Sequence, residues 1–292
     1  MQDSRLENAY RFCEATVRSH YENFPVASRF LPGGLRRPIA VIYAFARSAD
    51  DFADEGDLTK DERLAKLSEY STRLEYLHKP QEEPLFLALS DVVQKHRLSI
   101  ELLQSLLTAF SMDVTRTRYA GFSSVLFYCK HSANPIGRLL LELNKVTTQE
   151  AIQHSDAVCS ALQLINFYQD LGQDFDEHNR IYIPADEMLE YGVTVDHFRD
   201  KISDTKMIRL IEFQITRARQ LLLSGYPLGK LLRGRMGYEL RLIMEAGLLI
   251  CDKLMNHNNN VFARPRLHKQ DWLTVAWRAA VSHSYRKVSQ LT

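Results

Sequence analysis

The chain has 292 residues, of which 45% are hydrophobic and 25% charged, a balance typical of a globular protein with a sizeable apolar core. Its formal net charge of +1 excludes a bulk electrostatic attraction to nucleic acid, and 12 Gly and 9 Pro are few for a turn-rich all-β fold. The 4 cysteines are widely separated and form no Cys-x-x-Cys pair, which indicates buried free thiols in a reducing compartment.

Helical periodicity runs along the whole sequence, and no convincing run of alternating strand residues interrupts it. We therefore predict an all-α fold. The expected helices cover residues 4–20, 37–55, 60–78, 82–96, 99–113, 122–145, 149–177, 204–224, 230–256 and 270–288. No Pro/Gly/Ser-rich linker divides the chain, so we expect a single domain over residues 1–292.

Two of the expected helices carry aspartates four residues apart in otherwise apolar segments. These pairs are Asp50 with Asp54 and Asp170 with Asp174. The spacing places both carboxylates of a pair on one helix face. Buried carboxylates need a neutralising partner, and divalent cations that accept oxygen ligands fit best. We predict metal ions that grip a polyanion such as a diphosphate, with structural ion pairing to Arg or Lys as the alternative.

Further polar side chains extend both stripes at helical spacing. Tyr43 and Arg47 precede the first pair, so a guanidinium that could bind phosphate oxygens shares the face of the carboxylates. Gln163 and Asn166 precede the second pair, and amide oxygens are hard ligands that Mg²⁺ accepts. The sequence therefore predicts that both helices line one ligand cavity.

Two neighbouring segments complete the predicted cavity. Arg180 and Tyr182 follow the second aspartate helix and are expected at the cavity mouth. The segment 127–138 contains Lys130 and places Pro135 inside an expected helix, where proline forces a kink and frees a carbonyl group. Small residues around the kink would make room for a ligand, although a kink that serves packing alone is the alternative.

Other chemistries find little support in the sequence. The 10 histidines form no His-Glu-x-x-His motif, and no Gly-rich phosphate loop, dinucleotide fingerprint or Gly-x-Ser-x-Gly elbow is present. The absence of a dinucleotide fingerprint argues against a reductase step.

These motifs resemble those of the squalene/phytoene synthase family over nearly the whole chain. Arg47-x-x-Asp50-Asp51-x-x-Asp54 is similar to the first aspartate motif of the family, and Asn166-x-x-x-Asp170-x-x-x-Asp174 is similar to the second. The resemblance implies a single-domain isoprenoid synthase fold, with helices around a central apolar cavity and Mg²⁺-assisted loss of diphosphate from a prenyl substrate. It implies catalytic roles for Asp50, Asp54, Tyr128, Asp170 and Asp174, metal ligands Asp50, Asp54, Asn166, Asp170 and Asp174, and substrate contacts Tyr43, Arg47, Lys130, Gln163, Arg180 and Tyr182.

Three stretches, residues 20–28, 132–138 and 166–170, resemble the hydroxysqualene synthase branch of this family, HpnC of bacterial hopanoid biosynthesis. Phytoene and squalene synthases usually have Arg just before the first Asp of the second motif, where this chain has Gln169. One fewer cation suits a single diphosphate substrate, presqualene diphosphate, whose carbocation is captured by water to give hydroxysqualene. The alternatives are a head-to-head prenyl transferase that makes squalene or phytoene, and a non-catalytic isoprenoid-binding scaffold subunit, against which the intact aspartates argue.

The first residues form no signal peptide, and no apolar run reaches the roughly 20 residues that span a bilayer, so we expect a cytoplasmic protein. Residues 253–292 contain seven basic side chains and one acidic one, giving 7 − 1 = +6. This basic segment could attract the inner membrane, or be a solvated face without a lipid role. The resemblance also implies association with a presqualene diphosphate synthase and a hydroxysqualene reductase.

Overall fold

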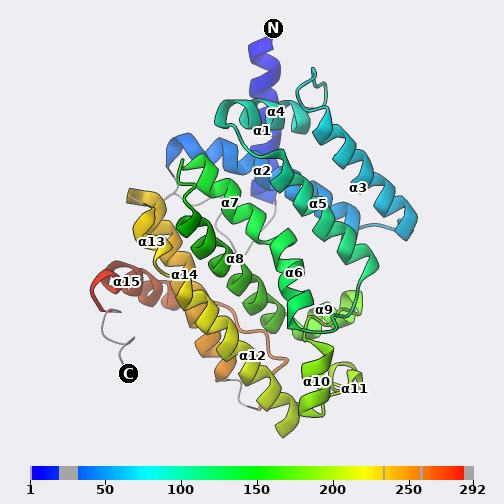
Figure 1. The fold of residues 1–292 in the computed structure, drawn as a ribbon, viewed down its shortest axis with the longest axis vertical. Helices are drawn as coiled ribbons and strands as arrows, with labels where there is room; N and C mark the ends of the chain where they lie inside the picture. Colours follow the sequence, from blue (N-terminus) through cyan, green and yellow to red (C-terminus); the bar gives the residue numbers. More distant parts are fainter. Residues whose placement is uncertain (1, 20–31, 233, 257–258, 286–292) are drawn as a thin grey trace. The chain divides into compact units, whose positions relative to one another are not determined.

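The computed structural model describes residues 2–19, 32–232, 234–256 and 259–285. In these ranges the chain forms fifteen α-helices (Figure 1) and no β-strand beyond one isolated bridge between Arg118 and Ile181. The predicted all-α class is therefore confirmed. The expected motif stretch 20–28, the end of the last expected helix and the basic residues Arg286 and Lys287 lie outside the described residues.

The helices gather into two compact units. Unit 1 comprises Met1–Arg116 and Lys130–Ile152, and unit 2 comprises Thr117–Cys129 and Gln153–Thr292. The single domain expected from the sequence stays a prediction. None of the described helices combines the length and the low polarity that crossing a membrane requires.

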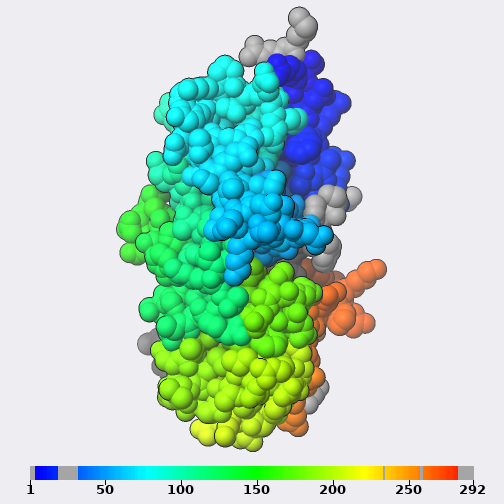
Figure 2. Space-filling model, turned by 90° about the vertical axis from the view of Figure 1, so that its right-hand side faces the viewer, coloured from blue at the N-terminus to red at the C-terminus, as the bar shows by residue number. Residues whose placement is uncertain are grey.

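Unit 1 is organised around α2, which contacts five other helices of the unit. The helices of this unit are α1 (Gln2–Ser19), α2 (Gly33–Asp54), α3 (Lys60–Glu75), α4 (Pro84–His96), α5 (Ile100–Thr115) and α7 (Asn134–Leu143). The buried ring of Phe45 on α2 stacks on Tyr70 at 5.8 Å and meets Phe86 edge-on at 6.3 Å. Aromatic pairs in these arrangements add to the apolar burial that holds the helices together. Helix α3 exposes much of its length and forms an outer face of the unit, sky blue in Figure 2.

Unit 2 contains most of α6 and of α8, and all of the later helices. They are α6 (Phe122–Ser132), α8 (Gln149–Gln169), α9 (Leu171–His178), α10 (Ala185–Tyr191), α11 (Val195–Arg199), α12 (Thr205–Ser224), α13 (Leu228–Leu231), α14 (Gly234–Met255) and α15 (Lys269–Tyr285). Helix α14 packs against α12, α13 and α15. A Cβ at Gly247 of α14 would lie 2.8 Å from Leu162 of α8 and 3.1 Å from Leu222 of α12, so the missing side chain permits this close packing.

The structure divides two helices that the sequence pattern predicted as continuous. The expected helix 122–145 ends at Ser132 and restarts at Asn134, with Pro135 in the first turn of α7. Proline is tolerated there because first-turn N–H groups have no partner within the helix, and the kink expected at Pro135 takes the form of a break between two helices. The expected helix 149–177 breaks at Asp170, which has φ −104° and ψ 16°. The short helices α10 and α11 were not predicted, and the expected helix 230–256 begins within the separate short helix α13.

Candidate active site

The first aspartate motif occupies the last turns of α2 in unit 1. The Arg47 Nε atom lies 2.7 Å from Asp51 Oδ1, and Arg47 Nη1 lies 3.3 Å from Asp50 Oδ2. A third carboxylate, that of Glu55, contacts Arg47 Nη2. The predicted phosphate-binding guanidinium is therefore engaged by carboxylates, as the ion-pairing alternative expected. Tyr43 and Asp54, which share the predicted stripe, are both half-buried.

An unpredicted residue, Tyr70 of α3, holds this end of α2 in place. Its hydroxyl lies 2.8 Å from Ser48 Oγ, and its ring meets Phe52 edge-on with centroids 4.9 Å apart. Ser48 and Phe52 are interleaved with the motif residues, so these two contacts fix the rotation of the helix about its axis. The stripe of Arg47, Asp50 and Asp54 is thereby kept on the opposite side from α3.

The second motif, in unit 2, keeps its helical spacing although the helix breaks. The Asp170 N–H donates to the Asn166 carbonyl at 2.9 Å, and the Asp174 N–H donates to the Asp170 carbonyl at 2.9 Å. These bonds place Asn166, Asp170 and Asp174 one turn apart, as predicted. Asp170 is buried, whereas Asn166, Asp174 and the predicted substrate contact Gln163 are half-buried.

The two carboxylates of this motif influence one another. Burial, followed by the charge of Asp170, raises the pKa of Asp174 to about 7, against the opposing effect of Arg180 and Arg264. A hard divalent cation would relieve this repulsion, so the oxygen donors fit Mg²⁺ chemically. In the described parts of the chain, no three His, Cys, Asp or Glu side chains converge on one point. Mg²⁺ commonly completes its octahedral coordination with water and substrate phosphate oxygens. An Mg²⁺ ion bound to the second motif would need these additional ligands.

Arg264 is a residue of the site that the sequence analysis missed. Its guanidinium donates two hydrogen bonds to the buried carboxylate of Asp170, one from Nε to Oδ1 and one from Nη2 to Oδ2 at 3.1 Å. Gln169 Nε2 donates to the carbonyl of Pro265 at 2.5 Å and thereby fastens the segment that carries Arg264. Gln169 itself brings no charge, but the guanidinium of Arg264 binds the carboxylate of the neighbouring Asp170. The expected loss of one cation at this motif is therefore offset by Arg264.

A cluster of aromatic rings lies next to the second motif. Phe167 and Tyr182 stack with ring centroids 3.6 Å apart, and Tyr128 lies 5.6 Å from Tyr182 and 5.9 Å from Phe167. Tyr119, 5.4 Å from Tyr182, completes the group. The structure thus brings the predicted residues Tyr128 and Tyr182 together and adds two unpredicted rings. Aromatic faces attract cations, so the cluster could stabilise a carbocation.

The backbone after α9 explains why Tyr182 reaches this cluster. The Arg180 N–H donates to the Asp174 carbonyl at 3.0 Å, and the Ile181 N–H donates to the Thr117 carbonyl at 3.0 Å. Arg180 is buried beside the motif, and its role as a substrate contact stays a prediction. Lys130, by contrast, is exposed in the last turn of α6 and belongs to unit 1, so its role as a substrate contact stays a prediction.

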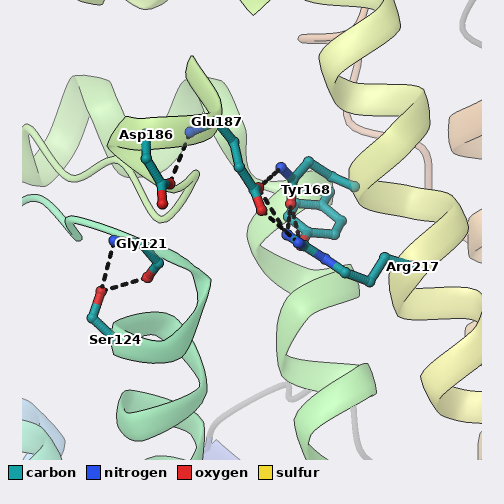
Figure 3. Close-up of polar contacts among 7 residues, drawn as sticks. Gly121, Ser124, Tyr168, Asp186, Glu187 and Arg217 are labelled. Atoms are coloured by element: carbon teal, nitrogen blue, oxygen red, sulfur yellow. Dashed lines mark hydrogen bonds and ion pairs between the residues drawn. The ribbon is translucent and has the colours of Figure 1, made fainter. Parts of the chain in front are cut away.

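Tyr168, which lies between Asn166 and Asp170 of the second motif, takes part in a buried network of hydrogen bonds. The Tyr168 hydroxyl donates to Gln214 Oε1 at 3.1 Å, and Gln214 Nε2 donates to Glu187. Arg217 donates to both oxygens of Glu187, at 2.6 and 2.9 Å, and to Gln214 Oε1 at 2.6 Å (Figure 3). The guanidinium carbon of Arg217 also lies 3.4 Å from the centroid of the Phe122 ring. These contacts tie α8, α10, α12 and the start of α6 together.

Comparisons of the sequence and of the structure with known proteins point to the same family. The sequence model of the squalene/phytoene synthase family matches residues 17–272. Hydroxysqualene synthase from Zymomonas mobilis is 32% identical over 267 residues, which cover 90% of this chain and 89% of the relative. The crystal structure of squalene synthase HpnC from Alicyclobacillus acidocaldarius superposes with a TM-score of 0.82 at 32% identity, covering 87% of this chain and 96% of that chain. A dehydrosqualene synthase structure, with a TM-score of 0.83 at 20% identity, covers 98% of this chain and all of its own, and supports the fold alone.

Proposed function

Because the chain belongs to the squalene/phytoene synthase family and has its all-α isoprenoid synthase fold, we propose that it is a hydroxysqualene synthase. The proposed reaction converts presqualene diphosphate and water into hydroxysqualene and diphosphate. Its main support is the likeness to hydroxysqualene synthase along almost the entire length of both chains. The placement of the predicted residues within unit 2 agrees with this reaction.

In the proposed reaction, the oxygen donors of both motifs would hold Mg²⁺, which when bound neutralises the charge that develops on the departing diphosphate. These donors are Asp50, Asp54, Asn166, Asp170 and Asp174. Arg180 and Arg264 lie against the second motif and would donate hydrogen bonds to diphosphate oxygens as the C–O bond breaks. Arg47 would serve in the same way beside the first motif. Each guanidinium would exchange a carboxylate partner for a phosphate oxygen.

The aromatic cluster has a different task in this proposal. Once diphosphate leaves, a cyclopropylcarbinyl cation remains and rearranges. The faces of Tyr128, Phe167 and Tyr182 would stabilise this cation and limit the entry of water. One water oxygen then bonds to the cationic carbon and loses a proton, which gives the alcohol. No reductant is consumed.

The product test uses purified protein with isotopically labelled presqualene diphosphate and Mg²⁺, in H₂¹⁸O and without a nicotinamide cofactor. We expect an alcohol that carries one solvent oxygen, detected by mass spectrometry, and little product from farnesyl diphosphate alone. Rapid formation of squalene or phytoene from farnesyl diphosphate would refute the proposal. It would favour the alternative, a head-to-head prenyl transferase.

One observation favours that alternative. Gln169 brings no charge to the second motif, but Arg264 places a guanidinium on Asp170, the next residue of the same motif. A site that keeps its cations could still accept two prenyl diphosphates in turn. The farnesyl diphosphate arm of the product test therefore separates the two functions directly.

A second prediction concerns Asp174 in protein without Mg²⁺. Its pKa is raised from 3.8 to about 7 in the folded protein. At a pH between these two values, the unfolded chain therefore binds fewer protons than the folded one. Stability should therefore fall as the pH rises from about 4 to 7 and then level off. Calorimetric melting temperatures at a series of pH values in this range should show a smaller fall for Asp174→Asn than for the unmodified protein.

Mg²⁺ should remove most of this pH dependence in the unmodified protein, because a bound cation favours the charged carboxylate. Asp196→Asn is the control, since Asp196 is exposed and pairs only locally with Arg199. Identical pH profiles for Asp174→Asn and the unmodified protein would contradict the prediction.

A further inference from the structure

Helix α15 carries an unusual set of exposed apolar side chains. The whole sequence contains two tryptophans, and both lie on this helix, drawn in red in Figure 1. The exposed fractions are 42% for Trp272, 68% for Trp277 and 75% for the adjacent Leu273. Large apolar residues gathered on one surface indicate an interaction site more strongly than single ones do.

Leu273 and Trp277 form a second face of the helix, distinct from the one that packs on unit 2. Val275 and Ala279 are fully buried and form an apolar cluster with Leu242 of α14. Leu273 and Trp277 are four residues apart, and with a helical advance of about 100° per residue they lie on another side from Val275 and Ala279. Trp272, in the first turn of α15, lies on the side of Val275 and Ala279 and is 42% exposed. Thus α15 buries one apolar face and leaves another exposed.

The charge around this face is positive. Arg266 and Lys269 are exposed just before and at the start of α15. Asp271, the sole acidic residue of the segment 253–292, pairs with Lys253 at 3.0 Å and accepts the His268 N–H at 2.6 Å. Its charge is therefore already balanced. Arg264, Arg278 and Lys253 pair with Asp170, Asp252 and Asp271, so among the described residues Arg266 and Lys269 carry the positive charge beside this face.

We propose that Leu273 and Trp277 of α15 insert into the interface of an anionic lipid bilayer, with Arg266 and Lys269 against the headgroups. Tryptophan favours this interface because its ring is apolar while its N–H can still reach water. Basic side chains near an anionic surface add attraction that salt screens. The strip consists of a few side chains of one helix, whereas a standard protein interface has roughly 20–30 residues on each side. A lipid surface suits it better than a folded partner.

The small number of tryptophans makes the test direct, because one of the two in the sequence, Trp277, lies on this face. The protein is mixed, without substrate, with vesicles of phosphatidylcholine alone or of phosphatidylcholine with phosphatidylglycerol. We expect a blue shift of the emission and co-sedimentation with the anionic vesicles. Lipids brominated near the headgroup end of the acyl chain should quench the emission. Raising the salt concentration should weaken binding.

Three variants that keep both tryptophans test the apolar insertion and the attraction to headgroups separately. Leu273→Glu should weaken binding to anionic vesicles by about tenfold or more, because it places a negative charge in the inserted strip. Lys269→Glu changes the charge by two units and should weaken binding by roughly thirtyfold at low salt. Leu189→Glu is the matched control, because Leu189 of α10 is 82% exposed in the same unit and has no part in the proposed face. It should bind as the unmodified protein does.

Unchanged emission with both kinds of vesicle would overturn the proposal, as would equal binding to neutral vesicles or equal losses for Leu273→Glu and Leu189→Glu. Emission that shifts with protein concentration alone, together with a dimer in analytical sedimentation that Leu273→Glu dissolves, would assign the face to a second copy of the chain. Circular dichroism of each variant checks that the helices are intact. Since no substrate is present, either result is independent of the proposed reaction.

Discussion

Alanine at Asp50, Asp54, Asp170 or Asp174 is expected to lower turnover of presqualene diphosphate by at least about 10²–10³-fold, the scale of losing one electrostatic contact to the leaving group. Each variant removes one of the proposed oxygen donors for Mg²⁺ and leaves the apolar side of its helix untouched. The helical circular dichroism should therefore stay the same. Steady-state rates at several Mg²⁺ concentrations measure the effect, and EDTA should abolish the activity of the unmodified protein.

Asp196→Ala and Asp200→Ala are the controls for this prediction. They repeat the Asp-x-x-x-Asp spacing in a polar part of unit 2 around the short helix α11. Both should retain nearly full activity. Equal losses at the controls, or full activity in EDTA, would show that the motifs do not bind metal.

The ion pair between Asp170 and Arg264 makes a sharper distinction possible. If the pair is only structural, Asp170→Asn and Arg264→Gln should both destabilise the protein and leave the response to Mg²⁺ unaltered. If Asp170 is a metal ligand, Asp170→Asn should raise the Mg²⁺ concentration needed for half-maximal rate. Arg264→Gln should instead raise the KM for the diphosphate substrate, because it removes a hydrogen-bond donor.

The sequence predicted the helices well because most of them bury one apolar stripe, and such a stripe recurs at helical spacing wherever the core requires it. The two aspartate motifs were also predictable, since each carboxylate pair stands out in an apolar helix. The break at Asp170 was not predictable, because the spacing from Asn166 to Asp174 continues through it unchanged. The disturbance of the helix at Pro135 was predictable, because proline removes a backbone hydrogen-bond donor.

The missed site residues share a physical reason. Arg264 reaches Asp170 across 94 positions of sequence, and Arg217 reaches Glu187 across 30. A single basic residue in a loop or on a polar helix face carries no periodicity that marks its partner. The segment charge of +6 indicated that the region is basic but not that one of its arginines binds the second motif. Likewise, the apolar residues of α15 predicted a helix but not which of its two faces is buried.

Arg217→Ala is expected to lower the free energy of unfolding by roughly 3 kcal/mol, because it leaves the mostly buried carboxylate of Glu187 without its cationic partner. The melting temperature should fall by roughly 5–10 °C on this scale. Gln214 would lose a donor as well, and with it the fixed geometry around the Tyr168 hydroxyl (Figure 3). Thermal unfolding followed by circular dichroism measures the change.

Arg199→Ala provides the matched comparison, because it also removes an arginine from a carboxylate in unit 2. Arg199 and Asp196 are both well exposed, and pairs of that kind contribute about 0–1 kcal/mol. We expect its melting temperature to stay close to that of the unmodified protein. Similar losses in the two variants would mean that the burial of the Glu187 pair is unimportant. A normal melting temperature for Arg217→Ala would show that water replaces the guanidinium, so that the network does not hold α8, and the second motif with it, against α12.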